Sequence, residues 1–323
     1  MSKAIRLYEH GGADRLRWEE YPVPAPGPGE VLVRHSAVGL NYYDIYVRSG
    51  LYPHSLPTGL GNEAAGAVTA LGKGVRAFRV GDRVAYHGGT PGAYAEQRVL
   101  HADQLVKLPR DISDEQAAAV MLKGLTAWAL LRRTHRVKRG DVVLVTAAAG
   151  GVGLILSQWA RALGAKVIGV VGSEAKVALA KRNGCRQVFV GYDGLAAKVR
   201  AYTKGQGVDV VYDGVGKDTF IAGLDCLKPC RLMVSFGNAS GAVPPVAPLE
   251  LMRRGSLFLT RPTVNDYLCD ARTRRQAARE LFAMIRRGKI GVLIGQRYAL
   301  RDAAIAHTAL ETRRTTGSTL LLP

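Results

Sequence analysis

Small residues follow one another at residues 147–153, where the chain reads Ala-Ala-Ala-Gly-Gly-Val-Gly. From Ala148 the run fits the spacing A-x-G-x-x-G, in which small residues let a pyrophosphate approach backbone N–H groups and the positive end of a helix. An apolar run at residues 142–146 predicts a strand before the turn, and residues 154–163 predict a helix after it. Strand, turn and helix in this order indicate a dinucleotide-binding site. Its candidate residues are Gly150, Gly151, Val152 and Gly153.

The end of the next predicted strand, residues 166–171, bears on which nucleotide binds. About twenty residues beyond the glycines, an NAD-binding chain usually places an acidic residue on the ribose. Here the strand is followed by Gly172 and Ser173, with Lys176 close behind. A hydroxyl and an ammonium suit a 2′-phosphate, so the sequence favours NADPH over NADH. The alternatives are that Lys176 is a solvated helix residue and that Glu174 contacts the ribose.

Four of the 13 tyrosines fall within eleven residues, around the polar pair Asn41 and Asp44. Aromatic faces can stack on a flat acceptor or on a nicotinamide ring, and phenol hydroxyls can donate to a developing oxyanion. The cluster therefore predicts a pocket for a flat molecule. The alternative is that two of the four, Tyr42 and Tyr43, are core residues. The four tyrosines are Tyr42, Tyr43, Tyr46 and Tyr52.

The cysteines and histidines show no spacing typical of a metal site. The four cysteines form neither a disulfide framework nor the paired short spacings of structural zinc, and the seven histidines have no ligand spacing. Only Cys226 and Cys230 stand close together, as two small buried side chains would. We expect no metal.

The net charge of +19 is large for this length. One interpretation is a basic face that binds nucleic acid or another acidic partner. The other is a solvated basic surface. The basic residues are spread along the chain, and none of their clusters is interleaved with aromatic residues as in a nucleic-acid platform. We favour the solvated surface and keep nucleic-acid binding as the alternative.

The length of 323 residues and a change of pattern along the chain predict two domains. In the first third, short β-branched runs separated by glycines indicate a compact β barrel or sandwich. Ser113 followed by Gln116 then resembles a helix capping box. Beyond Gly124, strands alternate with helices, which predicts βαβ units and a parallel sheet. A helical stretch at residues 272–287 precedes an apolar tail at 319–322 that could return as a strand to the first domain.

The longest uncharged stretch, residues 142–160, contains three glycines together with Ser157 and Gln158. It suits a strand, a loop and a buried helix better than a membrane span. The first ten residues contain no apolar signal core. We therefore expect a cytoplasmic protein without membrane contact.

Residues 140–161, GDVVLVTAAAGGVGLILSQWAR, resemble the motif of the zinc-independent quinone oxidoreductases, the zeta-crystallin-like branch of the medium-chain dehydrogenase/reductase superfamily. The likeness covers nearly the whole chain. It extends to GLNYYDIYVRSGLYP at 39–53, GNEAAG at 61–66, LKGLTA at 122–127, LMVSFGNASGA at 232–242 and the C-terminal GSTLLLP.

The resemblance implies an α/β architecture in three segments. A GroES-like, β-rich catalytic domain would occupy residues 1–124, a doubly wound Rossmann domain for NADPH residues 125–262, and a return to the catalytic domain residues 263–323. It also implies a homodimer formed by pairing the outer strands of two Rossmann sheets. Residues 232–236 are the candidate pairing strand, and an ordinary internal strand is the alternative.

The sequence departs from the zinc-bearing relatives at the metal ligands. Those relatives present Cys-x-x-Asp and Gly-His-Glu, whereas this chain has Asn41 and Asp44 at the first motif and Gly61-Asn62-Glu63 at the second. An amide is a poor zinc ligand beside thiolate or imidazole. No metal would therefore polarise the substrate oxygen.

The resemblance also implies site residues. Asn41, Tyr46 and Tyr52 would line the substrate pocket, and Asp44 would order the local network. The nucleotide would meet the glycine turn, then Ser173, Lys176 and Tyr192 around the adenosine phosphate, and Phe236 and Asn238 at the nicotinamide end. The remaining nucleotide candidates are Thr126, Arg261 and Arg313, the last of which could equally be a solvated charge at a helix end.

The expected reaction is zinc-independent transfer of a hydride, or of electrons, from NADPH to a quinone. Tyr46 or Tyr52 would donate to the acceptor oxygen, Asn41 would hydrogen-bond the substrate or a water, and water could supply the final proton. One alternative is an NADPH-dependent alkenal or enone double-bond reductase. Another is a basic RNA-binding protein of the zeta-crystallin kind.

Overall fold

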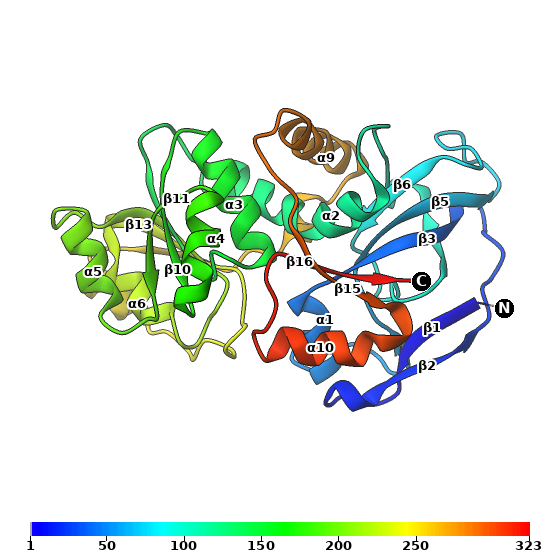
Figure 1. Ribbon diagram of the computed structural model, residues 1–323, viewed down its shortest axis with the longest axis horizontal. Coiled ribbons are helices and arrows are strands. Elements are labelled where there is room, and N and C mark those ends of the chain that lie inside the picture. The colour runs from blue at the N-terminus through cyan, green and yellow to red at the C-terminus, as the bar shows by residue number, and fades with distance from the viewer. Residues whose placement is uncertain (1) are drawn as a thin grey trace. The chain divides into compact units, whose positions relative to one another are not determined.

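The computed structural model describes residues 2–323, which fold into two compact units (Figure 1). Unit 1 comprises the chain up to Leu125 together with Leu268–Arg286 and Val292–Pro323. Unit 2 comprises Thr126–Tyr267 and Arg287–Gly291. Both ends of the described chain therefore belong to unit 1.

Unit 1 is β-rich, with a seven-stranded sheet in the order β15-β16-β3-β5-β6-β8, to which β7 adds by pairing with β3. A smaller sheet has the order β2-β1-β4. In β3, Val31 and Val33 are buried while Leu32 and Arg34 between and beyond them are not, as expected for a strand with one face on a core. The strands are β1 (Ser2–Leu7), β2 (Leu16–Tyr21), β3 (Glu30–Leu40), β4 (Thr58–Gly59), β5 (Glu63–Leu71), β6 (Arg83–His87), β7 (Gln97–His101), β8 (Leu105–Lys107), β15 (Ile294–Ala299) and β16 (Ser318–Leu322).

The helices that bear on unit 1 are α1 (Tyr42–Ser49), α2 (Asp114–Ala129), α9 (Ala271–Arg286) and α10 (Ala303–Glu311). The capping box expected at Ser113 is confirmed, because Gln116 N donates to Ser113 Oγ at 3.1 Å and Ser113 N donates to the Gln116 amide oxygen at 3.0 Å. The C-terminal strand β16 pairs antiparallel with β3 and parallel with β15. The last residues of the chain therefore complete the sheet that its first forty residues begin.

Unit 2 contains a six-stranded parallel sheet in the order β11-β10-β9-β12-β13-β14. Counted from β9, this is the order 3-2-1-4-5-6 of the doubly wound dinucleotide-binding fold. Helices α3 and α4 lie on one side of the sheet and α5 and α6 on the other (Figure 1). The predicted fold class, a β-rich domain plus a Rossmann sheet, is confirmed. The strands are β9 (Val142–Val145), β10 (Lys166–Val171), β11 (Cys185–Val190), β12 (Val208–Asp213), β13 (Leu227–Ser235) and β14 (Phe258–Thr260).

The helices of unit 2 are mostly short. They are α3 (Gly151–Ala162), α4 (Val177–Arg182), α5 (Leu195–Tyr202), α6 (Phe220–Asp225), α7 (Pro248–Arg253) and α8 (Val264–Tyr267). Within residues 2–323, no helix combines the length and the apolar character that a membrane span requires.

The proposed pairing strand at residues 232–236 is not the outer strand of the sheet. It belongs to β13, which lies between β12 and β14, with Leu232 opposite Phe258 and Met233 opposite Leu259. That expectation is therefore wrong, and β14 is the outer strand on this side of the sheet, with β11 at the opposite edge. The sequence did not predict β14, because this strand has only three residues and directly follows a basic turn that contains glycine.

Candidate active site

In the turn between β9 and α3, no N-cap side chain binds the backbone N–H groups that begin the helix. Gly150 is the N-cap residue of α3 and offers no side chain to the first N–H groups of the helix, which have no partner inside the helix itself. A Cβ at Gly153 would lie 2.3 Å from the Ala147 carbonyl oxygen and 2.9 Å from Ala148 Cα. Only glycine therefore lets the helix approach the turn so closely. These uncapped N–H groups can donate hydrogen bonds to the oxygens of a pyrophosphate.

Ser173, Lys176 and Tyr192 lie just beyond the carboxyl ends of two neighbouring strands, β10 and β11. The strand ends are held together by the bond from Gly191 N to Val171 O, at 3.0 Å. Ser173 is exposed and begins the 3-10 turn that Lys176 ends, and Lys176 is half-buried. At such a strand end an NAD-binding chain places a carboxylate on the ribose. Here Ser173 and Lys176 bring a hydroxyl and an ammonium, with the Glu174 carboxylate between them in the chain.

Phe236, Asn238 and Arg261 come together beyond the carboxyl ends of β13 and β14. Arg261 Nη1 donates to the Ser235 carbonyl oxygen at 2.7 Å. With the Asn238 amide turned so that its oxygen faces the guanidinium, that oxygen accepts from Arg261 Nη2 at 3.2 Å. The Phe236 ring packs against Gly214, where an added Cβ would lie 2.9 Å from Phe236 Cζ. The carboxyl edge of the sheet thus carries these three candidates together.

Asp213, which the sequence analysis did not single out, organises the loop after β12. Its Oδ1 accepts from Thr146 Oγ1 at 2.8 Å, from Thr219 Oγ1 at 2.6 Å and from Val215 N at 3.0 Å. Burial raises the pKa of this carboxyl, and the hydrogen bonds oppose that rise. The sequence did contain a signal for this residue, because Asp213 is an acidic residue at the end of a buried strand and is directly followed by Gly214.

Thr126 and Arg313 are the two nucleotide candidates that stand apart from these groups. Thr126 is half-buried in α2. Arg313 lies in unit 1, two residues after α10, exposed and with a φ of 58°. Both remain predictions.

In unit 1, Asn41 and Glu63 meet in a buried polar cluster with Lys123. Asn41 Nδ2 donates to Glu63 Oε1 at 2.8 Å and to the Gly39 carbonyl oxygen at 3.3 Å. Lys123 Nζ lies 2.7 Å from the same Glu63 oxygen, and Leu122 N donates to Glu63 Oε2 at 2.5 Å. The Glu63 and Lys123 side chains are 0% and 6% exposed. Both N–H groups of the Asn41 amide are donated inside the protein, so toward a ligand Asn41 can only accept.

Asp44 connects this cluster to a chain of buried hydrogen bonds. Asp44 Oδ2 accepts from Asn41 N and from the Tyr94 hydroxyl, each at 2.9 Å. Tyr94 Oη lies 3.1 Å from His307 Nε2, and Arg48 Nη1 lies 3.2 Å from His307 Nδ1. Because Arg48 can only donate, His307 accepts at Nδ1, carries its proton on Nε2 and donates to Tyr94. In each hydrogen bond of the chain, the acceptor therefore lies on the side nearer to Asp44.

The protonation states agree with these directions. Burial, with Arg48 beside it, lowers the pKa of His307 to about 3. Burial raises the pKa of Asp44 to about 7 against the two hydrogen bonds at Oδ2. Within residues 2–323, Asp44 Oδ1 has no hydrogen-bond partner. The raised pKa favours the protonated form of Asp44, and Oδ1 is the oxygen without a hydrogen-bond donor among these residues.

The tyrosines of α1 and the following loop form one aromatic group. The ring centroids of Tyr46 and Tyr52 are 5.1 Å apart, and those of Tyr43 and Tyr52 are 5.8 Å apart, both edge-to-face. Tyr46 is buried and Tyr52 half-buried. The Tyr43 hydroxyl faces His54 Nε2 at 3.4 Å, and the Tyr42 hydroxyl donates to the Leu310 carbonyl oxygen at 3.1 Å. The structure thus brings the predicted pair Tyr46 and Tyr52 together beside Asn41 and Asp44.

At the positions that match the zinc ligands of the zinc-bearing relatives, the side chains suit an internal ion pair better than zinc. Asn41 and Asn62 supply amides, and the Glu63 carboxylate is already bound by an ammonium, an amide and a backbone N–H. The part of the chain that the structure describes holds no group of three or more His, Cys, Asp or Glu residues able to bind a metal ion.

Comparison with known proteins completes the description of the site. Residues 27–110 match the family described as "Alcohol dehydrogenase GroES-like domain", and residues 151–285 match "Zinc-binding dehydrogenase". The chain is 50% identical to a quinone oxidoreductase of Pseudomonas aeruginosa, with 100% of both chains covered. It is 43% identical to a 2-haloacrylate reductase of a Burkholderia species, over 100% of this chain and 99% of that one. The crystal structure of an Escherichia coli quinone oxidoreductase complexed with NADPH matches with a TM-score of 0.97 at 46% identity, covering 99% and 100%.

Proposed function

The chain belongs to the quinone oxidoreductase family of the medium-chain dehydrogenase/reductase superfamily, and we propose from this premise that it reduces quinones with NADPH. One observation carries the proposal. The uncapped N-terminus of α3 is followed, at the end of the next strand, by a hydroxyl and an ammonium in place of an acid. This pairing selects a dinucleotide with a 2′-phosphate.

The residues that would hold NADPH follow the carboxyl edge of the unit 2 sheet. The glycine turn would bind the pyrophosphate and Ser173, Lys176 and Tyr192 the adenosine phosphate, while Phe236, Asn238 and Arg261 would face the nicotinamide end. Thr126 and Arg313 are further candidates. When bound, NADPH supplies the hydride, and the protein supplies orientation and hydrogen bonds.

The residues of unit 1 would bind the acceptor. Tyr46 and Tyr52 offer two aromatic faces and two hydroxyls, which can donate to an oxygen that becomes negative during reduction. Asn41, whose amide N–H groups are bound by Glu63 and Gly39, would accept from the reduced product or from a water. Asp44 does not touch the acceptor in this proposal. It is a positioning residue, because its Oδ2 binds Asn41 N at the start of α1.

We propose that this chemistry needs no metal. The Glu63 carboxylate is occupied by Lys123 and Asn41, and the amides of Asn41 and Asn62 are weak zinc ligands. Charge that develops on the acceptor oxygen would then be stabilised by tyrosine hydroxyls.

A second candidate function is the reduction of an activated carbon–carbon double bond. The 43% identity to a 2-haloacrylate reductase over the full chain favours it. Cofactor and fold would be the same, and only the acceptor would differ. An acceptor panel of benzoquinones, an alkenal and 2-chloroacrylate, each followed as NADPH oxidation, separates the two functions.

The test of the acceptor pocket uses matched tyrosine variants. Removing one hydroxyl that stabilises an oxyanion costs roughly 10²–10³ in kcat. We expect Tyr46→Phe or Tyr52→Phe to lose at least tenfold in kcat for the best acceptor. Tyr43→Phe is the control, because the Tyr43 hydroxyl faces His54. Equal rates for all three variants would contradict the assignment.

We also propose that two chains form a homodimer through β14. This outer strand carries two exposed apolar side chains, Phe258 and Leu259, which are 62% and 39% exposed. Unpaired edge strands with apolar residues favour pairing with another strand. Sedimentation of Phe258→Asp should show a monomer, while Ile305→Asp, at an equally exposed apolar position in unit 1, should remain a dimer. A Phe258→Asp protein that stays dimeric would exclude β14 as the interface.

The proposed location of the protein in the cell depends on where NADPH is supplied. We propose a cytoplasmic protein because the reaction draws on NADPH, a reductant of that compartment. Fractionation of cells that express the full chain tests this, and recovery with the membranes would contradict it.

A further inference from the structure

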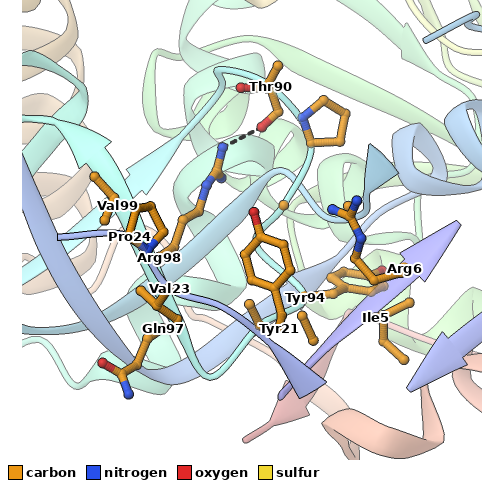
Figure 2. Close-up of a pocket in the computed structure, with 15 residues that line it drawn as sticks. Ile5, Arg6, Tyr21, Val23, Pro24, Thr90, Tyr94, Gln97, Arg98 and Val99 are labelled. Atoms are coloured by element: carbon orange, nitrogen blue, oxygen red, sulfur yellow. Dashed lines mark hydrogen bonds between the residues drawn. The ribbon is translucent and has the colours of Figure 1, made fainter. Parts of the chain in front are cut away.

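A cavity of about 210 Å³ opens in unit 1, and none of the residues that line it is assigned above to the acceptor or the nucleotide (Figure 2). Its walls come from β1, from the end of β2 and the Pro-rich segment after it, from the loop at residues 90–95 and from β7. A cavity of about 150 Å³ is enough to hold benzene. This one therefore has room for a single aromatic ring with a polar substituent.

The charge in this cavity is entirely positive. Arg6 and Arg98 line it, and none of the lining residues is acidic. Among residues 2–323, neither guanidinium forms an ion pair with a carboxylate. Arg6 also lies near the Tyr8 hydroxyl, which donates to Glu19 at 2.6 Å. Two guanidinium groups around one hollow, neither of them in an ion pair within the described residues, favour an anion.

Arg98 is held in place while it faces the cavity. One guanidinium nitrogen donates to the Thr90 carbonyl oxygen and another to the Tyr86 hydroxyl at 3.4 Å. The Arg98 Cζ also lies 5.3 Å from the centre of the Tyr86 ring. These contacts use two of the five N–H groups of a guanidinium. The group is thus positioned before any ligand arrives, which lowers the entropy cost of binding.

Tyr21 gives the cavity an aromatic wall. Its ring centre lies 5.1 Å from Arg6 Cζ, and in Figure 2 the ring stands between the side chains of Arg6 and Arg98. Apolar lining comes from Ile5, Val23 and Val99. A flat apolar body could lie against these groups while its anionic end meets the two arginines.

We propose that this cavity is a binding site for a small aromatic carboxylate, separate from the acceptor and nucleotide sites. The Arg pair recognises the carboxylate, because guanidinium groups match its two oxygens with parallel N–H donors. Tyr21 and the apolar lining recognise the ring. Tyr94 lies at the wall of the cavity and also donates from its hydroxyl to Asp44, so the site backs onto the buried chain of unit 1.

The test is calorimetric titration of the full chain with benzoate. We expect saturable binding with one site per chain, and binding of the neutral isostere benzamide at least tenfold weaker. Arg6→Gln should raise the benzoate Kd at least tenfold, which corresponds to about 1.4 kcal/mol. Arg17→Gln is the matched control, because it removes the same charge from an exposed residue directly opposite Arg6 on β2, outside the cavity.

Three results would overturn the proposal. Equal weakening by Arg6→Gln and Arg17→Gln would show a general effect of net charge. Equal affinity for benzoate and benzamide would show that the anion is not recognised. Binding of inorganic phosphate without benzoate would show that no aromatic body is recognised. Thermal unfolding of each variant separates loss of binding from loss of folding, and unchanged KM for NADPH in Arg6→Gln separates this site from the nucleotide site.

Discussion

The ion pair between Lys123 and Glu63 provides the sharpest test of how unit 1 is held together. Lys123 Nζ lies 2.7 Å from Glu63 Oε1, and the two side chains are 6% and 0% exposed. Lys123→Met keeps most of the side-chain volume and removes the charge. The Glu63 carboxylate then keeps only Asn41 Nδ2 and Leu122 N as partners. Breaking a buried pair from one side costs about 3–5 kcal/mol, because one charge stays buried without its partner.

This magnitude is large enough to measure by thermal unfolding. For a unit of this size, each kcal/mol shifts Tm by about 2–4 °C, so Lys123→Met should lower the Tm of unit 1 by roughly 6–20 °C. Arg297→Met is the control, because the Arg297–Glu115 pair is 48% and 38% exposed and should contribute about 0–1 kcal/mol.

The double variant tests the cause. Glu63→Gln with Lys123→Met removes both charges and keeps one acceptor oxygen, for either Asn41 Nδ2 or Leu122 N. We expect it to be more stable than Lys123→Met alone, because no unpaired charge remains buried. A double variant that unfolds below the single one, or a single variant no less stable than the Arg297→Met control, would refute this reasoning.

Three further predictions concern the nucleotide and Asp44. Lys176→Ala should raise the KM for NADPH roughly tenfold or more and leave that for NADH nearly unchanged; an equal loss for both would refute the phosphate contact. Gly153→Ala should weaken NADPH binding in a fluorescence titration, because its Cβ would meet the Ala147 carbonyl oxygen at 2.3 Å, and wild-type affinity would contradict this. Burial raises the pKa of Asp44 to about 7, above its ordinary value of 3.8, so the native protein holds an extra proton between these pH values. Its unfolding free energy should therefore fall as pH rises through this window, by at most about 1.4 kcal/mol per pH unit, and Asp44→Asn should remove that dependence in urea titrations.

Much of unit 2 could be predicted from the sequence, because its strands are continuous apolar runs and its glycines sit at turns. The strand at residues 166–171 and the helix that follows the glycine turn appear as expected. The outer strand β14 could not be predicted. Its three residues form a strand because they pair with β13, and that pairing depends on the tertiary fold.

Only part of the candidate site could be predicted from the sequence. Asn41, Asp44 and the tyrosines stand close together in the chain, so local spacing revealed them. Lys123 and His307 lie far from them in sequence and reach the cluster only through the packing of α2 and α10. Glu63 stood within the motif at residues 61–66, yet its ion pair requires a partner sixty residues away. Side-chain partners of this kind follow from the fold.

The most direct test of the central claim is the rate of NADPH oxidation by a benzoquinone, measured on the full chain after treatment with a metal chelator. We expect turnover that survives the chelator and falls strongly when NADH replaces NADPH, because Ser173 and Lys176 stand where an NAD-binding chain has an acid. Turnover that the chelator abolishes, or equal turnover with NADH, would contradict the account.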